Sequence, residues 1–284
     1  MLKQRVITAV VLLAILLPAL FYPNALVFCA ITLVLIAAGA WEWGRLNGCT
    51  QTLSAALALA CVLLCGLLWY AGWLDKPLPI LWTLAGGGWV VAGAWLLRQG
   101  VPGWPRVPKV VRLSGGLTAL CLAWLAIAQA RVMGINFLLS VLLLVWVADI
   151  FAYFAGRTLG GRFSKGKLAP SISPGKSWEG VWGGMAGVVL MSLVWVGLDN
   201  AATPNALSGS LYARLWGQHG VVVMLVAVVF LTAMSVVGDL VESLIKRSAG
   251  VKDSSGLLPG HGGVLDRVDA LLPALPLAMM LVSF

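Results

Sequence analysis

Apolar stretches long enough to cross a lipid bilayer recur along almost the whole chain, and they restrict its fold more than any other feature. A membrane-spanning helix needs about 17 to 25 mostly apolar residues. Stretches of this kind lie near residues 6–22, 25–43, 53–73, 79–97, 113–131, 136–155, 179–197, 220–240 and 270–284. We therefore predict an all-α, polytopic integral membrane protein with about nine transmembrane helices, the last of them being short for a span.

Composition agrees with lipid as the main solvent of the chain. Of the 284 residues, 61% are hydrophobic and 10% are charged, whereas soluble domains have about a quarter charged residues. No segment is left over for a soluble domain. We predict one membrane-embedded domain over residues 1–284, with about five N-terminal spans in residues 1–135 and the helices that carry function in residues 136–284.

Two features that are typical of secreted proteins are weak in this sequence. The first apolar stretch follows the basic residues Lys3 and Arg5, but residues 18–22 offer no convincing small-x-small cleavage site. The cysteines are 5 in number, and an odd count that falls mostly within apolar stretches does not fit a disulfide framework. We expect an uncleaved first helix and cysteines that act as small buried hydrophobes.

The basic residues predict the orientation in the membrane, because Lys and Arg are retained on the cytoplasmic side. With a cytoplasmic N-terminus, all of the 19 Lys and Arg residues except Lys76, Arg131 and Arg214 fall on that side. The cytoplasmic loops then include residues 156–180 and 247–269. The net charge of +9 follows from this distribution, so we expect no nucleic-acid partner.

The end of the eighth span carries a polar stripe. Asp239, Glu242, Ser243 and Lys246 are spaced at i, i+3, i+4 and i+7, which places them on one helix face. A solvated helix end with i, i+4 charge pairs would show the same pattern. Asp239, however, lies next to the apolar run, where an ionisable group is costly and usually has a partner or a function.

A glycine-rich segment follows this stripe. Its glycines, as in Pro259-Gly260-His261-Gly262-Gly263, would let backbone N–H groups approach a phosphate. His261 is either a phosphate contact or a structural histidine. Asp266 and Asp269 then share a helix face if the last helix begins there, and carboxylates combined with phosphates are typical of Mg²⁺ sites. We predict a polyphosphate and metal site in this segment.

A second polar stretch precedes the seventh span. Ser177 and Glu179 fit a helix N-terminal cap as well as they fit substrate contact. Asp149 lies inside the sixth span, where a carboxylate needs a partner or a function. We therefore include Asp149 among the candidate site residues.

The pattern Ser243-x-x-Lys246-Arg247-x4-Lys252-Asp253-x-Ser255-x2-Leu258-Pro259-x-His261-Gly262-Gly263-x2-Asp266-Arg267-x-Asp269 resembles the signature of the phosphatidate cytidylyltransferases, or CDP-diacylglycerol synthases. No position departs from it. The resemblance extends to the stretches around Asp149 and Lys176, whereas the N-terminal third carries no motif. It implies that CTP and phosphatidic acid give CDP-diacylglycerol and pyrophosphate, and that Mg²⁺ is required, with K⁺ as a candidate second cation.

The residues divide into three groups of candidates. The catalytic candidates are Asp239, Lys246, Arg247, Lys252, Asp266 and Arg267. Candidates for contact with CTP or the lipid phosphate are Asp149, Lys176, Ser177, Ser243, Asp253, His261, Gly262 and Gly263. The candidate metal ligands are Asp239, Asp266 and Asp269.

Two other functions remain open from the sequence. A CTP-dependent lipid or polyprenol kinase could use a similar site, and a transporter would also place acidic groups near the membrane, although closer to the bilayer centre. We expect CTP, phosphatidic acid and membrane lipids as partners, with a homodimer as a further option. We also expect a multi-pass protein of the bacterial cytoplasmic (inner) membrane with its active site facing the cytoplasm.

Overall fold

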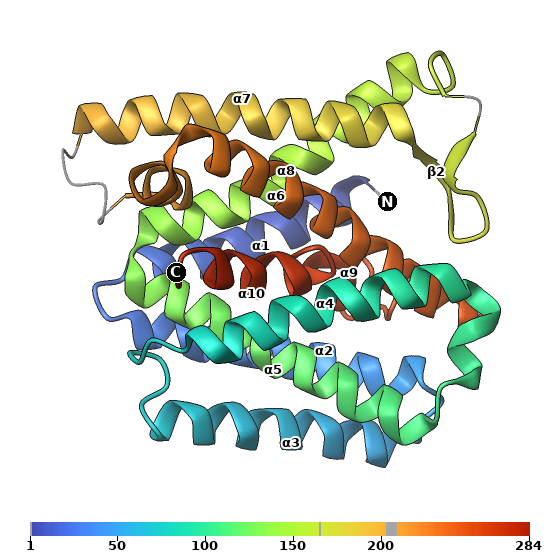
Figure 1. The fold of residues 1–284 in the computed structure, drawn as a ribbon. Helices are drawn as coiled ribbons and strands as arrows, with labels where there is room; N and C mark the ends of the chain where they lie inside the picture. Colours follow the sequence, from blue (N-terminus) through green and yellow to red (C-terminus); the bar gives the residue numbers. More distant parts are fainter. Residues whose placement is uncertain (1, 165, 203–208) are drawn as a thin grey trace.

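The computed structural model describes residues 2–164, 166–202 and 209–284, which form a bundle of helices (Figure 1). Its long helices are α1 (Leu2–Phe21), α2 (Ala25–Leu46), α3 (Gln51–Tyr70), α4 (Pro79–Gln99), α5 (Lys109–Met133), α6 (Ile135–Leu159), α7 (Trp178–Ala202) and α8 (Leu211–Ser248). Among the described residues, these 8 helices are long and apolar enough to cross a membrane. The predicted all-α, polytopic membrane fold is confirmed.

The predicted ninth span, residues 270–284, does not form a helix of transmembrane length. Helix α10 (Leu271–Leu281) has 11 residues and is about 16 Å long, compared with a hydrocarbon core of about 30 Å. Residues 271–279 are all buried, and α10 packs against α4, α5, α6 and α8 near the centre of the bundle (Figure 1). This segment is apolar because other helices surround it.

Short elements lie between the long helices and revise the predicted loops. The expected loop 156–180 contains an antiparallel hairpin of β1 (Lys167–Ala169) and β2 (Ser173–Ser177), in which Lys167 pairs with Ser177. Helix α9 (Leu265–Val268) shortens the second predicted loop, which now runs over residues 249–264. A 3₁₀ helix, η1 (Val101–Arg106), connects α4 to α5. The sequence did not predict these short elements, because each is only a few residues long and hydrophobic patterns identify longer segments.

Helix α8 is longer than its predicted span because it includes a segment before a break at Gly220. The φ of 82° and ψ of 168° at this residue are not helical, and glycine adopts positive φ at little cost. The continuous part after Gly220 carries the polar stripe to the end of the helix.

The N-terminal end of α1 contacts loop 249–264. The Arg5 Nε donates a hydrogen bond to the carbonyl oxygen of Gly260 at 2.9 Å, and the Thr8 hydroxyl donates to that of Pro259 at 2.8 Å. The start of the chain and the predicted phosphate-binding loop therefore lie at the same end of the bundle.

The cysteines form no disulfide, and three of them are neighbours. Cys61 and Cys65 on α3 and Cys121 on α5 are buried, with their sulfur atoms all within 4.8 Å of one another. The sequence predicted buried small side chains but not this proximity, because it depends on how α3 packs against α5.

Candidate active site

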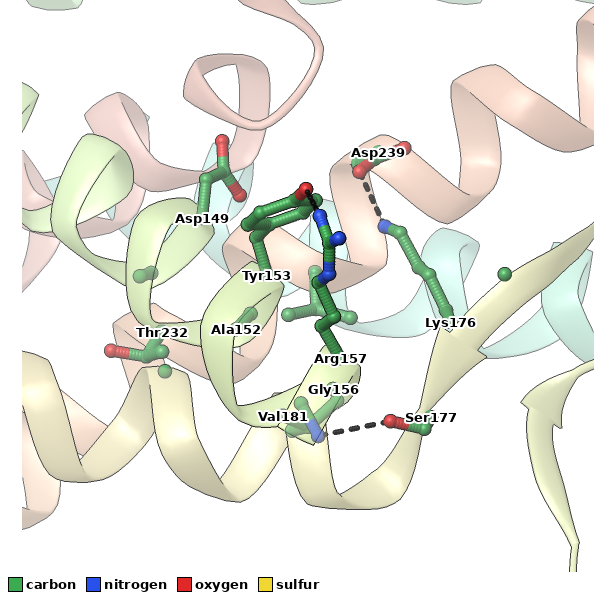
Figure 2. Close-up of a pocket in the computed structure, with 15 residues that line it drawn as sticks. Asp149, Ala152, Tyr153, Gly156, Arg157, Lys176, Ser177, Val181, Thr232 and Asp239 are labelled. Carbon is green, nitrogen blue, oxygen red and sulfur yellow. Dashed lines mark hydrogen bonds and ion pairs between the residues drawn. The ribbon is translucent and has the colours of Figure 1, made fainter. Parts of the chain in front are cut away.

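A cavity of about 400 Å³ opens between α6, α7, α8 and β2. Asp149 on α6, Lys176 on β2 and Asp239 on α8 line it from three different elements (Figure 2). The Lys176 ammonium group forms an ion pair with the Asp239 carboxylate. The structure thus brings together three predicted site residues that are far apart in the sequence.

Small residues let α6 and α7 approach closely below these polar groups. A Cβ atom on Gly180 would lie 3.0 Å from the carbonyl oxygen of Ala152, and one on Gly184 would lie 2.9 Å from that of Ala148. Such close contact between membrane helices is typical of small-residue interfaces. All four residues also line the cavity. The cavity therefore combines a polar end with an apolar wall, which suits an amphiphilic ligand.

A second group of charges lies farther along α8. The Lys246 ammonium group contacts the carboxylates of Glu242 and Asp266, and the side chains of these acids are each only 5% exposed. Glu242 and Lys246 are an i, i+4 pair, as the stripe predicted. Asp266 joins them because α9 packs beside the end of α8. Lys246 and Asp266, both predicted as catalytic, are therefore direct partners.

Asp266 also organises the glycine-rich loop. Its Oδ2 accepts hydrogen bonds from the backbone N–H of Ser254 (2.8 Å), the Ser254 hydroxyl (2.8 Å) and the backbone N–H of Gly263 (2.7 Å). Burial alone would raise the pKa of this carboxyl, but hydrogen bonds from Lys246, Gly263 and Ser254 outweigh burial and lower it. The lowered pKa favours the ionised form of Asp266, which is the form that binds a metal ion.

Asp269 lies close enough to Asp239 for their charges to interact. Burial, followed by the negative charge of Asp239, raises the pKa of the Asp269 carboxyl to about 7. One of its oxygens, Oδ1, accepts a hydrogen bond from the backbone N–H of Ala270 at 2.7 Å. A nearby cation would favour the ionised form of this carboxyl.

Carboxylates outnumber ammonium groups in this region, which fits a divalent cation. Lys176 pairs with Asp239, and Lys246 pairs with Glu242 and Asp266, whereas Asp269 is a fourth carboxylate of this region. Glu242 Oε1 is buried and has no hydrogen-bond partner among the described residues. Within the described part of the chain, the three predicted metal ligands do not all lie within 4.8 Å of one another. A Mg²⁺ ion here would be held by one or two of these carboxylates together with substrate phosphates, which is its usual mode of binding.

Glu42 on α2 is fully buried and was not among the predicted site residues. Its carboxylate accepts hydrogen bonds from the backbone N–H groups of Val264 (2.9 Å) and Leu265 (2.8 Å) and from the hydroxyls of Ser254 and Ser255. Glu42 therefore fixes both ends of the loop segment that leads to Asp266. The signal was available, since Glu42 is the only acidic residue before Asp75 and stands within an apolar stretch.

Ser177 caps α7, whereas Glu179 binds the segment that follows α6. The Ser177 hydroxyl accepts a hydrogen bond from the backbone N–H of Gly180 at 3.1 Å, so the capping interpretation is confirmed, although Ser177 also lines the cavity. Glu179 Oε1 accepts hydrogen bonds from the backbone N–H groups of Phe163 and Ser164. These contacts hold the segment after α6 against the start of α7.

The remaining candidate site residues are spread over a wider area than the sequence predicted. The Ser243 hydroxyl donates to Asp239 Oδ1 at 3.2 Å, and Arg247 Nε donates to the carbonyl oxygen of Ile172 in the hairpin turn at 3.4 Å.

Lys252, Asp253 and Arg267 are exposed. His261 Nδ1 is buried without a hydrogen-bond partner. Gly262 has a φ of 81°, and a Cβ atom there would lie 2.6 Å from Asp266 Oδ2, so both its conformation and its surroundings require glycine.

Known proteins are similar to this chain along nearly its full length. The model of the cytidylyltransferase family matches residues 3–284. A phosphatidate cytidylyltransferase of Pseudomonas aeruginosa is 39% identical over 283 residues, which cover 97% of this chain and 95% of the relative. The proteins of the same name from Haemophilus influenzae and Brucella abortus are each 35% identical, over 97% and 96% of this chain and 96% and 90% of their own lengths.

Proposed function

The chain belongs to the cytidylyltransferase family, and from this premise we propose its reaction and the roles of its residues. It is a phosphatidate cytidylyltransferase, which converts CTP and phosphatidic acid into CDP-diacylglycerol and pyrophosphate. The observation that carries this conclusion is the similarity to relatives of that name over at least 96% of the chain. The cavity with a charged end and an apolar wall supports an amphiphilic substrate.

The reaction needs little proton transfer. A phosphate monoester has a second pKa of about 6, so phosphatidic acid is largely a dianion at neutral pH. One of its oxygens attacks the α-phosphorus of CTP in line, a new P–O bond forms, and the bond from the α-phosphorus to the bridging oxygen breaks. Pyrophosphate leaves with that oxygen. Catalysis therefore depends on positioning and on neutralising charge.

The three ion pairs of the site suggest how charge is neutralised. Lys176 is paired with Asp239, and Lys246 with Glu242 and Asp266. Phosphate groups are competing partners for ammonium groups. We propose that Lys176 and Lys246 turn from these carboxylates to the substrate phosphates when substrates bind, which leaves carboxylate oxygens free for a cation.

We propose that one or two of the carboxylates of Asp239, Asp266 and Asp269 hold Mg²⁺ together with the CTP phosphates. When bound, the ion supplies positive charge to the polyphosphate and to the leaving pyrophosphate. The support is the chemistry of the donor set, since oxygen ligands with negative charge are those that Mg²⁺ prefers. K⁺ remains a candidate second cation, and Arg247, Lys252 and Arg267 are candidates for contacts with the phosphates.

We also propose that the protein lies in the inner membrane of a bacterial cell and that its active site faces the cytoplasm. The distribution of Lys and Arg supports this orientation, and the contact of Arg5 with Gly260 brings the N-terminus to the same end of the bundle as the loop. CTP is a cytoplasmic metabolite, so this orientation gives it direct access to Asp239 and Asp266.

The decisive experiment uses the purified full chain, phosphatidic acid and CTP labelled at its α-phosphate. We expect the label to enter the lipid fraction and unlabelled pyrophosphate to be released in equal amount. Release of labelled CDP without labelled lipid would instead identify a CTP-dependent kinase. Label that remains in CTP under saturating Mg²⁺ would refute the proposed reaction.

A further inference from the structure

A second cavity lies on the other side of α8 from the catalytic charges. It is a groove of about 380 Å³ between α4 and α5, bordered by η1 and by Trp43 of α2. Its volume falls within the range of about 300–1,000 Å³ that is typical of ligand sites. The residues that line it are almost all apolar, so its ligand must be mostly apolar as well.

One end of the groove carries buried donors without partners. Trp104 is 6% exposed, and among the described residues neither its Nε1 nor the buried Nε of Arg112 has a hydrogen-bond partner. The Arg112 guanidinium group lies over the Trp104 ring at 5.7 Å, and the Arg112 carbonyl oxygen accepts a hydrogen bond from Trp43 Nε1 at 3.0 Å. These contacts hold two N–H groups and a positive charge ready for an anionic acceptor.

The dimensions match one lipid in one leaflet. The groove follows α5 from Arg112 to Leu122, which is about 15 Å at the helical rise and therefore about half of the hydrocarbon core. Arg112 stands in the first turn of α5, where a lipid headgroup would lie. A phosphate at Arg112 would thus place an acyl chain along the groove.

Charge near the groove favours a lipid with a net negative headgroup. Arg106, Lys109 and Arg112 lie close together in the sequence, and no acidic residue occurs between Asp75 and Asp149. An acyl chain gains little by leaving the bilayer for an apolar groove, since lipid tails are as apolar as the side chains. Selectivity must therefore come from the headgroup and its contacts with Arg112 and Trp104.

The groove is separate from the catalytic cavity. Val241 and Ile245 of α8 line the groove, whereas Asp239 and Lys246 lie on another face of the same helix. The two cavities share no lining residue. We propose that this groove binds an anionic membrane phospholipid that stays with the protein and is not the reacting substrate.

Two glycines on α4 supply a matched pair of variants. A Cβ atom on Gly87 or on Gly88 would meet nothing within 4 Å, but only Gly88 lines the groove. Gly88→Leu should fill the groove, whereas Gly87→Leu should place its side chain outside it. Arg112→Gln removes the charge, and Arg98→Gln is its control, because Arg98 is exposed at the end of α4 and does not line the groove.

The test places the full chain in bilayers of phosphatidylcholine alone, or of phosphatidylcholine and phosphatidylglycerol in equal parts. We expect phosphatidylglycerol to raise the Tm of the wild type, Gly87→Leu and Arg98→Gln, and native mass spectrometry to find it retained. Arg112→Gln should bind it about tenfold more weakly, which corresponds to the loss of a charge-assisted hydrogen bond. Phosphatidylglycerol should not raise the Tm of Gly88→Leu, because the leucine side chain fills the groove.

Three outcomes would overturn this proposal. An unchanged response to phosphatidylglycerol in Arg112→Gln would show that the groove does not select an anionic lipid, even if Gly88→Leu failed to fold. A raised KM for phosphatidic acid in Gly88→Leu would assign the groove to the substrate. Dissociation of an oligomer in Gly88→Leu would assign the groove to a second copy of the chain.

Discussion

The Asp266 side chain connects the end of α8 to the glycine-rich loop. One oxygen contacts Lys246, and the other accepts three hydrogen bonds from Ser254 and Gly263. Asp266→Asn keeps the shape but removes the charge that balances Lys246 and that a cation would need. We expect turnover to fall by more than about tenfold, because catalysis here depends on charge neutralisation. Initial rates over a full Mg²⁺ titration measure this effect.

Asp75→Asn is the matched control for this substitution, since Asp75 is an exposed carboxylate outside both charge clusters. It should leave turnover and Tm unchanged. The Tm of Asp266→Asn in detergent separates a catalytic defect from unfolding. Turnover close to that of the wild type at any Mg²⁺ concentration would remove Asp266 from the metal site.

Helix α2 supports the glycine-rich loop through Glu42. In Glu42→Gln the amide group no longer offers two carboxylate oxygens to Val264 and Leu265, and a buried N–H group left unpaired costs about 1–3 kcal/mol. We expect kcat to fall about tenfold, since the loop that orients Asp266 loosens. Hydrogen exchange at the amides of Val264 and Leu265 should become faster, and this readout does not depend on activity.

Asp199→Asn is the control for the Glu42 variant. Asp199 is a buried carboxylate that accepts hydrogen bonds from the backbone N–H of Ser210 (2.9 Å) and from Asn136 Nδ2 (2.8 Å). It lies near the C-terminal end of α7 and the start of α8, away from the glycine-rich loop. This variant should lose stability while its exchange at Val264 stays slow. Equal exchange in Glu42→Gln and the wild type would show that Glu42 does not position the loop.

The crossing of α8 with the start of α10 depends on Gly238. A Cβ atom on Gly238 would lie 2.5 Å from the carbonyl oxygen of Asp269 and 2.7 Å from Pro273 Cγ. Gly238→Ala must push these elements apart, which we expect to cost about 1–3 kcal/mol of unfolding free energy, as overpacking does. Because Asp239 and Asp269 flank this contact, activity should fall as well.

Gly66→Ala on α3 is the natural comparison, since a Cβ atom there would meet nothing within 4 Å. Alanine in an open helical position should keep or raise Tm, because it reduces the freedom of the unfolded chain. Thermal unfolding of both variants in the same detergent measures the difference. An unchanged Tm and activity for Gly238→Ala would mean that α8 and α10 can separate without cost.

At the scale of the whole molecule, the sequence predicted what depends on local patterns. Apolar length located the long helices, and a charged residue beside an apolar run identified Asp239. Burial by distant segments was not predictable, so residues 270–284 were predicted as a span. Glu42 stands out in the sequence as an acid within an apolar stretch, but its partners, which lie 212 to 223 positions away, could not be predicted. The ion pair between Lys176 and Asp239 likewise depends on a hairpin too short to be recognised.

These long-range contacts predict that the two parts of the chain cannot work separately. Residues 108–284 contain every candidate from the family signature, but α10 packs against α4, and Glu42 of α2 holds loop 249–264. A cut between η1 and α5 leaves α1 to α4 in one fragment. We expect membranes with residues 108–284 alone to form no CDP-diacylglycerol, and co-expression of residues 1–107 to restore it. An N-terminal fragment with Glu42→Gln should restore less, whereas full activity of the C-terminal fragment alone would show that the catalytic loop needs no support from α2.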